Sequence, residues 1–66
     1  MNILLNGKTI ELAGGLSLND IVARFAKTPE HVITEVNGKI IARAQWEETP
    51  LSPDDKIELI TFVGGG

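Results

Sequence analysis

The sequence predicts a small α+β domain in which one main helix packs across one face of a mixed sheet of four to five strands. Three observations support this fold class. Two Asn-Gly pairs, at residues 6–7 and 37–38, each separate two short β-prone runs. The stretch between Ser17 and Pro29 has helical spacing, and residues 56–63, KIELITFV, form the longest β-prone run. The predicted order is hairpin, helix, two short strands and a final strand.

Length and composition limit the classes of protein to which the chain can belong. A chain of 66 residues forms one small domain, because its size leaves room for a single core. It has no cysteine, so it lacks disulfides and a thiolate nucleophile. The net charge of -3, with 6 basic against 9 acidic residues, argues against nucleic acid as a partner. Without a long apolar run or a signal-peptide pattern, we expect no membrane association and a cytoplasmic location.

The two Asn-Gly pairs predict two hairpins, because these residues tolerate the positive φ angles of a tight two-residue turn. The first hairpin is predicted over residues 1–12, with strands MNILL and KTIEL. The second joins residues 32–36 to residues 39–42. Residues 43–48, which carry Trp46, are predicted to form a helical turn.

The helix is predicted to begin at Leu18. Ser17 is placed as its N-cap, with Asp20 three residues later as the capping partner. Thr28-Pro29 ends the helical region, because a residue before proline is pushed out of the α region. One apolar stripe is expected to face the core, formed by Leu18, Ile21, Val22 and Phe25.

Both faces of the last strand carry apolar residues. Side chains alternate across a strand, which places Ile57, Leu59, Thr61 and Val63 on one face and Lys56, Glu58, Ile60 and Phe62 on the other. If the helix covers the first set, Ile60 and Phe62 lie exposed beside Leu4 of the first strand, and these three residues form a docking surface for a protein partner. The alternative is that Ile60 and Phe62 fill the buried face of a central strand beneath a loop.

Candidate catalytic and metal-binding residues are few. A zinc site needs about four ligands, whereas the chain has no cysteine and one histidine, His31, which is expected to lie in solvent. Ser17 is better explained as a helix cap than as a nucleophile, since no histidine is paired with it. Gly14-Gly15 lacks the lysine and further glycines of a phosphate-binding loop. We therefore predict that the chain has no catalytic residue and binds no metal.

Three glycines, Gly64, Gly65 and Gly66, follow directly on the last strand. Glycine loses the most backbone entropy on ordering, so we expect a flexible tail without side chains after a domain of residues 1–63. Its one reactive group is the α-carboxylate of Gly66, a poor electrophile until its oxygen becomes a leaving group, for instance by adenylation with ATP. The alternative is a frayed end with no role.

Three stretches of the sequence match a known family. They are the opening ILLNGK, the stretch VNGKIIARAQW with Arg43 three residues before Trp46, and DKIELITFV leading into the glycines. On these stretches the whole chain resembles the ThiS family of ubiquitin-like β-grasp sulfur carriers, which serve thiamin (thiazole) biosynthesis. Two positions depart from the family's pattern: Asp54-Asp55 stands where Gly-Asp is expected, and Ala42 stands where proline is frequent.

The resemblance implies a ubiquitin-like β-grasp fold and a carrier cycle. An E1-like activating enzyme would use ATP to adenylate Gly66, and sulfur from a cysteine-desulfurase persulfide would replace AMP, giving a thiocarboxylate. The thiocarboxylate would donate its sulfur to thiazole synthase. Gly64 and Gly65 would thread into the partners' active sites, where a Cβ would obstruct them. The carrier would be a substrate rather than an enzyme, with no bound cofactor, and a monomer when free.

Two other functions are compatible with the sequence. The small subunit of molybdopterin synthase is also a β-grasp thiocarboxylate carrier, although it is usually longer and commonly has prolines before its Gly-Gly end. A ubiquitin-like interaction or protein-modifying domain would instead use its tail to form an isopeptide bond.

Overall fold

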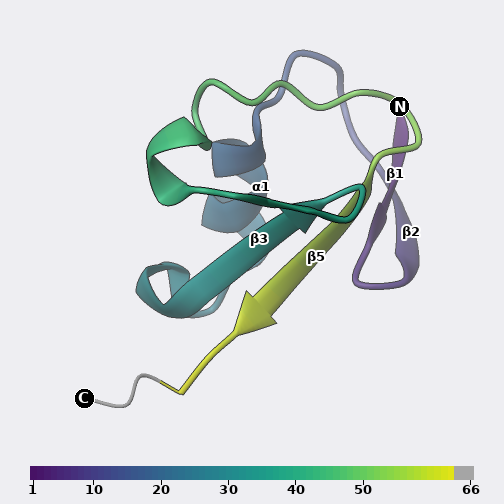
Figure 1. Ribbon diagram of the computed structural model, residues 1–66. Helices are drawn as coiled ribbons and strands as arrows, with labels where there is room; N and C mark the ends of the chain where they lie inside the picture. Colours follow the sequence, from purple (N-terminus) through teal and green to yellow (C-terminus); the bar gives the residue numbers. More distant parts are fainter. Residues whose placement is uncertain (64–66) are drawn as a thin grey trace.

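The computed structural model describes residues 1–63, which form one mixed five-stranded sheet with an α-helix against one face (Figure 1). The strand order is β2-β1-β5-β3-β4; β1 and β5 are parallel, and the other neighbouring strands are antiparallel. The predicted α+β class and order of elements are confirmed. The elements are β1 (Asn2–Leu5), β2 (Lys8–Glu11), α1 (Leu18–Phe25), η1 (Pro29–His31), β3 (Val32–Val36), β4 (Lys39–Ile41), η2 (Arg43–Gln45) and β5 (Lys56–Thr61), where η marks a 3-10 helix.

Both predicted Asn-Gly hairpins are present. The φ angles are 48° at Asn6 and 80° at Gly7, and 52° at Asn37 and 85° at Gly38. Two consecutive positive φ angles are typical of the type I′ turn, whose twist matches that of the flanking strands. Asparagine and glycine enter this left-handed region at lower cost than other residues, which is why the pairs predict the turns.

Helix α1 begins at the predicted residue, Leu18, and has the predicted cap. The Ser17 Oγ accepts a hydrogen bond from the Asp20 backbone N at 3.3 Å, and the Ser17 N donates to the Asp20 carboxylate at 2.8 Å. The helix ends at Phe25 and Ala26 is extended, so it stops before the predicted Thr28-Pro29 boundary, where the chain enters η1. No helix in residues 1–63 is long and apolar enough to cross a membrane.

The core lies between α1 and one face of the sheet. Its buried apolar side chains are Ile3, Leu5, Leu18, Ile21, Val22, Val32, Trp46, Leu51 and Ile57. Three positions of the predicted helical stripe are therefore confirmed. The fourth is wrong, because the Phe25 side chain is 44% exposed. Phe25 is the last residue of α1, so no further helical turn follows to cover its ring.

Trp46 closes the core beside η2. Its Nε1 donates to Thr34 Oγ1 at 2.9 Å, and Thr34 Oγ1 donates in turn to the Ile41 carbonyl at 3.0 Å, so the polar atoms buried here are paired. The Arg43 guanidinium lies 4.4 Å from the centre of the Trp46 ring and donates to the Pro29 carbonyl at 2.9 Å. The spacing of Arg43 and Trp46 in the sequence thus has a structural explanation: Arg43 covers the ring and ties η2 to η1.

The central strand β5 is held by the two hairpin asparagines as well as by its neighbours β1 and β3. Asn6 Oδ1 accepts a hydrogen bond from the Leu59 N at 2.8 Å, just beyond the end of β1. Asn37 Oδ1 accepts from the Lys56 N at 2.9 Å, and its Nδ2 donates to the Asp55 carboxylate at 2.9 Å. Sequence analysis identified both asparagines as turn residues and missed this second role.

The two departures from the family pattern have backbone conformations that suit the expected residues. Asp54 has a φ of 68°, in the left-handed region that glycine adopts without steric cost. Ala42 has a φ of -63°, the value that a proline ring fixes. Both positions therefore keep the backbone conformation that the expected residue would adopt.

Candidate functional site

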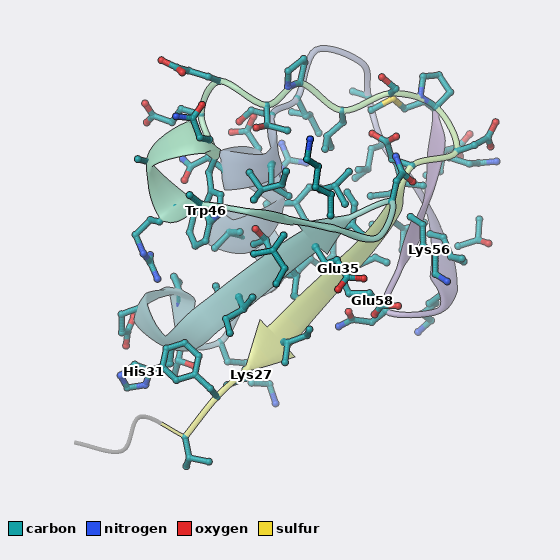
Figure 2. All side chains as sticks on the ribbon, viewed as in Figure 1. Lys27, His31, Glu35, Trp46, Lys56 and Glu58 are labelled. Carbon is teal, nitrogen blue, oxygen red and sulfur yellow. The ribbon has the colours of Figure 1, made fainter. Side chains whose placement is uncertain are left out.

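The predicted glycine tail, residues 64–66, lies outside the described residues, but the structure describes the segment that leads to it. Strand β5 ends at Thr61, and the Phe62 N donates to the His31 carbonyl at 2.9 Å, which continues the pairing past the strand. The rings of His31 and Phe62 contact each other, with centroids 5.6 Å apart. His31 is exposed, as predicted, and lies beside the end of β5 (Figure 2).

The outer face of the sheet, opposite α1, carries exposed apolar side chains. Ile60 is 47% exposed and Phe62 is 41% exposed, whereas Ile57 on the inner face of β5 is fully buried. The predicted division of the strand into two faces is confirmed. The alternative, in which Ile60 and Phe62 are buried beneath a loop, is wrong.

Leu4 lies on the outer face but not beside Ile60. In the parallel ladder Leu4 pairs with Lys56, four residues before Ile60 along β5. At a rise of about 3.3 Å per residue, the separation along the strand is about 13 Å. The expected adjacency is therefore wrong, because it depends on a strand register that local patterns do not encode. A role of Leu4 in partner binding stays a prediction.

Two isoleucines on neighbouring strands extend the exposed apolar surface. Ile33 pairs with Ile60 across β3 and β5, and Ile40 of β4 pairs with Glu35 of β3. Sequence analysis missed both, although alternation along β3 separates Ile33 from the buried Val32 and Thr34. We name the set Ile33, Ile40, Ile60 and Phe62 the outer patch; its members are 39%, 66%, 47% and 41% exposed.

Two glutamates lie side by side next to the outer patch. Glu35 and Glu58 are directly opposite each other in the antiparallel β3–β5 ladder, and both are half-buried. Figure 2 shows the two side chains together, with Lys56 nearer the start of β5. Like charges directly opposite on one face of a sheet repel each other. The outer face therefore combines apolar residues with a repulsive acidic pair.

A second apolar surface lies on the helix side of the sheet. The C-terminal end of α1 and β5 form a groove whose lining includes Phe25, Lys27, Leu59 and Thr61. Phe25 and Phe62 are thus aromatic side chains of similar exposure on opposite sides of the sheet. Each side of the sheet therefore offers one aromatic side chain to a partner. Substituting Phe25 and Phe62 in turn compares the two sides as docking surfaces.

Few side chains within residues 1–63 are arranged for catalysis. The Ser17 hydroxyl is engaged with Asp20 at the start of α1, which confirms its role as a helix cap. Within residues 1–63, no group of three or more His, Cys, Asp or Glu side chains is positioned to hold a metal ion. The features that remain are the two surfaces and the strand that leads to the glycines.

The fold is that of ubiquitin-like β-grasp proteins. A crystal structure of the thiamine biosynthesis protein ThiS from Geobacter metallireducens matches it with a TM-score of 0.83 and 30% identity, covering 100% of both chains. The chain belongs to the ThiS family, whose family model matches residues 3–66.

Two further proteins have sequences similar to that of this chain. The sulfur carrier protein ThiS of Bacillus subtilis is 35% identical over 63 residues, which cover 94% of this chain and 96% of that protein. The thiazole synthase of Magnetococcus marinus is 33% identical over 66 residues. That match covers 100% of this chain but 20% of the length of the synthase.

Proposed function

We propose that this protein is a sulfur carrier of thiamin biosynthesis whose C-terminal carboxylate, on Gly66, is the site of chemistry. Membership of the ThiS family is the observation that carries this proposal. The fold supports it, because the central strand β5 leads toward the C-terminal glycines and exposes Ile60 and Phe62 on its outer face. A partner that docks on that face can reach the end of the chain.

The proposed cycle begins with adenylation. An E1-like enzyme joins the Gly66 carboxylate to the α-phosphate of ATP and releases pyrophosphate, which turns a carboxylate oxygen into part of a leaving group. A persulfide sulfur from a cysteine desulfurase then attacks the acyl carbon and displaces AMP. A thiol then attacks the desulfurase cysteine sulfur of the resulting acyl disulfide, which releases the thiocarboxylate and leaves a new disulfide between the thiol and that cysteine. Gly64 and Gly65 carry no Cβ, which allows a narrow active-site channel to accept the chain.

The proposed sulfur acceptor is thiazole synthase. The Magnetococcus marinus relative supports this partner, because a protein named thiazole synthase contains a segment similar to the whole of this chain. A carrier and the enzyme that it serves gain effective concentration when they are joined in one polypeptide. In this cycle the carrier is a substrate, it binds no cofactor of its own, and its partners perform the catalysis.

Intact-mass spectrometry tests the proposal. The protein is incubated with its adenylating enzyme, ATP, a cysteine desulfurase, cysteine and a reducing thiol. The mass should rise by the difference between a sulfur atom and an oxygen atom. A variant with one alanine added after Gly66 should stay folded and keep its mass. The Bacillus subtilis carrier, with its own enzymes, serves as the positive control. No mass change in a reaction whose control succeeds would refute the carrier function.

A further inference from the structure

The C-terminal end of β5 is paired on one side. Strand β1 pairs with the first two residues of β5, and the Asn6 side chain bonds the backbone of Leu59. From Ile60 onward, the backbone pairing that the structure gives is with β3 and His31. Burial adds little there, because the Ile60 side chain is 47% exposed. Strand ends with few buried contacts open easily, so the position of this end depends on what His31 contributes.

His31 holds Phe62 at two points. The His31 carbonyl accepts a hydrogen bond from the Phe62 N at 2.9 Å, which extends the ladder by one residue beyond the pair of Val32 and Thr61. The His31 ring lies against the Phe62 ring, with centroids 5.6 Å apart (Figure 2). Val63, the next residue, is 99% exposed. The chain therefore leaves the surface of the domain directly after its contact with His31.

His31 is itself connected to the core through η1 and η2. The His31 N donates to the Thr28 carbonyl at 2.8 Å, which closes the single turn of η1. The Pro29 carbonyl in that turn accepts a hydrogen bond from Arg43 at 2.9 Å, and the Arg43 guanidinium lies over the Trp46 ring. Trp46 is buried in the core. A continuous chain of contacts thus runs from Trp46 to His31 and fixes His31 relative to the core.

We propose that His31 is a positioning residue for the adenylation of Gly66; this inference rests on the proposed function. By holding Phe62, it fixes the point from which the C-terminal glycines extend. Three residues span at most about 11 Å, so the short tail cannot compensate for a shifted starting point. A misplacement of about 1 Å can slow a reaction about 100-fold. His31 acts through Phe62, and the adenylating enzyme performs the chemistry.

The ring of His31 is the part that a substitution can test. The backbone hydrogen bond to Phe62 is available to any residue at position 31, whereas the ring contact requires a ring. His31→Ala removes the ring and keeps the carbonyl, and His31→Phe keeps a ring against Phe62. Glu30→Ala is the matched control, because it truncates the exposed neighbour of His31 within the same η1 turn.

Single-turnover adenylation measures the expected effect. With ATP present and the adenylating enzyme in saturating excess, the rate constant reports the chemical step separately from docking. His31→Ala should react at least about tenfold more slowly than the unchanged protein. His31→Phe should react within about threefold of the unchanged protein, because its ring replaces the lost contact. Glu30→Ala should react within about twofold.

Two measurements on the free protein distinguish positioning from folding. The Phe62 amide, followed by NMR, should exchange with solvent at least about tenfold faster in His31→Ala, because the strand end opens more often. The melting temperature should change little, since His31 is exposed. A slower reaction of a protein with unchanged melting temperature is the expected combination.

Four results would overturn the inference: an unchanged rate in His31→Ala, an equal loss in Glu30→Ala, a loss that His31→Phe does not restore, or an unchanged Phe62 exchange rate. A raised KM for the carrier with an unchanged rate at saturation belongs to the first result and would make His31 a docking residue. Failure of the carrier function gives a different result. In that case the unchanged protein is not adenylated at all, although the Bacillus subtilis carrier reacts with its own enzyme.

Discussion

The two faces of the sheet differ in what covers them, although both carry isoleucines. On the inner face α1 packs over Ile3 and Ile57, which are 1% and 0% exposed. On the outer face, Ile33 and Ile60 are 39% and 47% exposed. Among the described residues, α1 covers the opposite face of the sheet (Figure 1). Hydrophobicity along β5 is therefore no guide to burial. The inner face stabilises the fold, and the outer face has apolar area available for a partner.

The largest expected effect comes from the inner face. Ile57→Ala should lower the free energy of unfolding by about 2–5 kcal/mol, because it leaves a cavity beneath α1. Ile60→Ala is the matched control, three residues later on the other face, and should cost about 0.5–1 kcal/mol. Urea unfolding of both variants provides the measurement. Equal losses would mean that the outer face also contributes to the core.

The next effect concerns binding. Phe62→Ala should weaken binding to the adenylating enzyme by about 2 kcal/mol or more, which is more than tenfold in affinity, because it removes an aromatic anchor of the outer patch. Its thermal stability should change little, since substitutions at exposed positions usually stay within about 0.5 kcal/mol.

Phe25→Ala is the control for Phe62→Ala, since it removes a similarly exposed ring from the opposite side of the sheet. It should leave the affinity for the adenylating enzyme unchanged. If Phe25→Ala weakens binding as much as Phe62→Ala does, the docking surface is not confined to the outer face.

A smaller effect is expected where α1 begins. Ser17→Ala should lower the free energy of unfolding by about 0.5–2 kcal/mol, because the Asp20 backbone N loses its capping acceptor. Ser17→Asn, which preserves an acceptor, should recover most of the loss. Chemical denaturation followed by circular dichroism is a suitable measurement. A loss that Ser17→Asn does not reduce would argue against the cap as its cause.

The smallest effect is a gain in stability before β5. Asp54→Gly should raise the free energy of unfolding by less than about 1 kcal/mol, because relief of the left-handed strain exceeds the entropy that glycine loses. Thermal melting should detect the gain. A lower melting temperature would mean that the Asp54 side chain contributes contacts that outweigh its backbone strain.

Local chemistry was sufficient to predict much of the fold. The Asn-Gly pairs identified both turns, Ser17 and Asp20 identified the helix start, and alternation along β5 assigned Ile57 and Ile60 to opposite faces. These features depend on residues close together in the chain, where the steric and hydrogen-bonding causes operate.

The failed predictions required knowledge of how distant segments meet. Phe25 has the correct spacing for the core, but α1 ends there. Strand alternation correctly places Leu4 on the outer face. The parallel register, however, places it opposite Lys56 and not beside Ile60. The acidic pair and the adjacency of Ile33 to Ile60 follow from the pairing of β3 with β5, which separate strand patterns do not specify.

The place of β5 in the strand order has a consequence for synthesis on the ribosome. The hairpins β2-β1 and β3-β4 are joined in the sheet by β5, which is made after both of them. A nascent chain that has not yet reached residue 56 therefore has two separate hairpins, each marginal in stability without a third strand. Closing the sheet pairs β1 with β5, a contact between distant parts of the chain that forms late. Incomplete chains consequently lack the assembled outer face, so an enzyme that recognises this face would select chains whose last strand is in place.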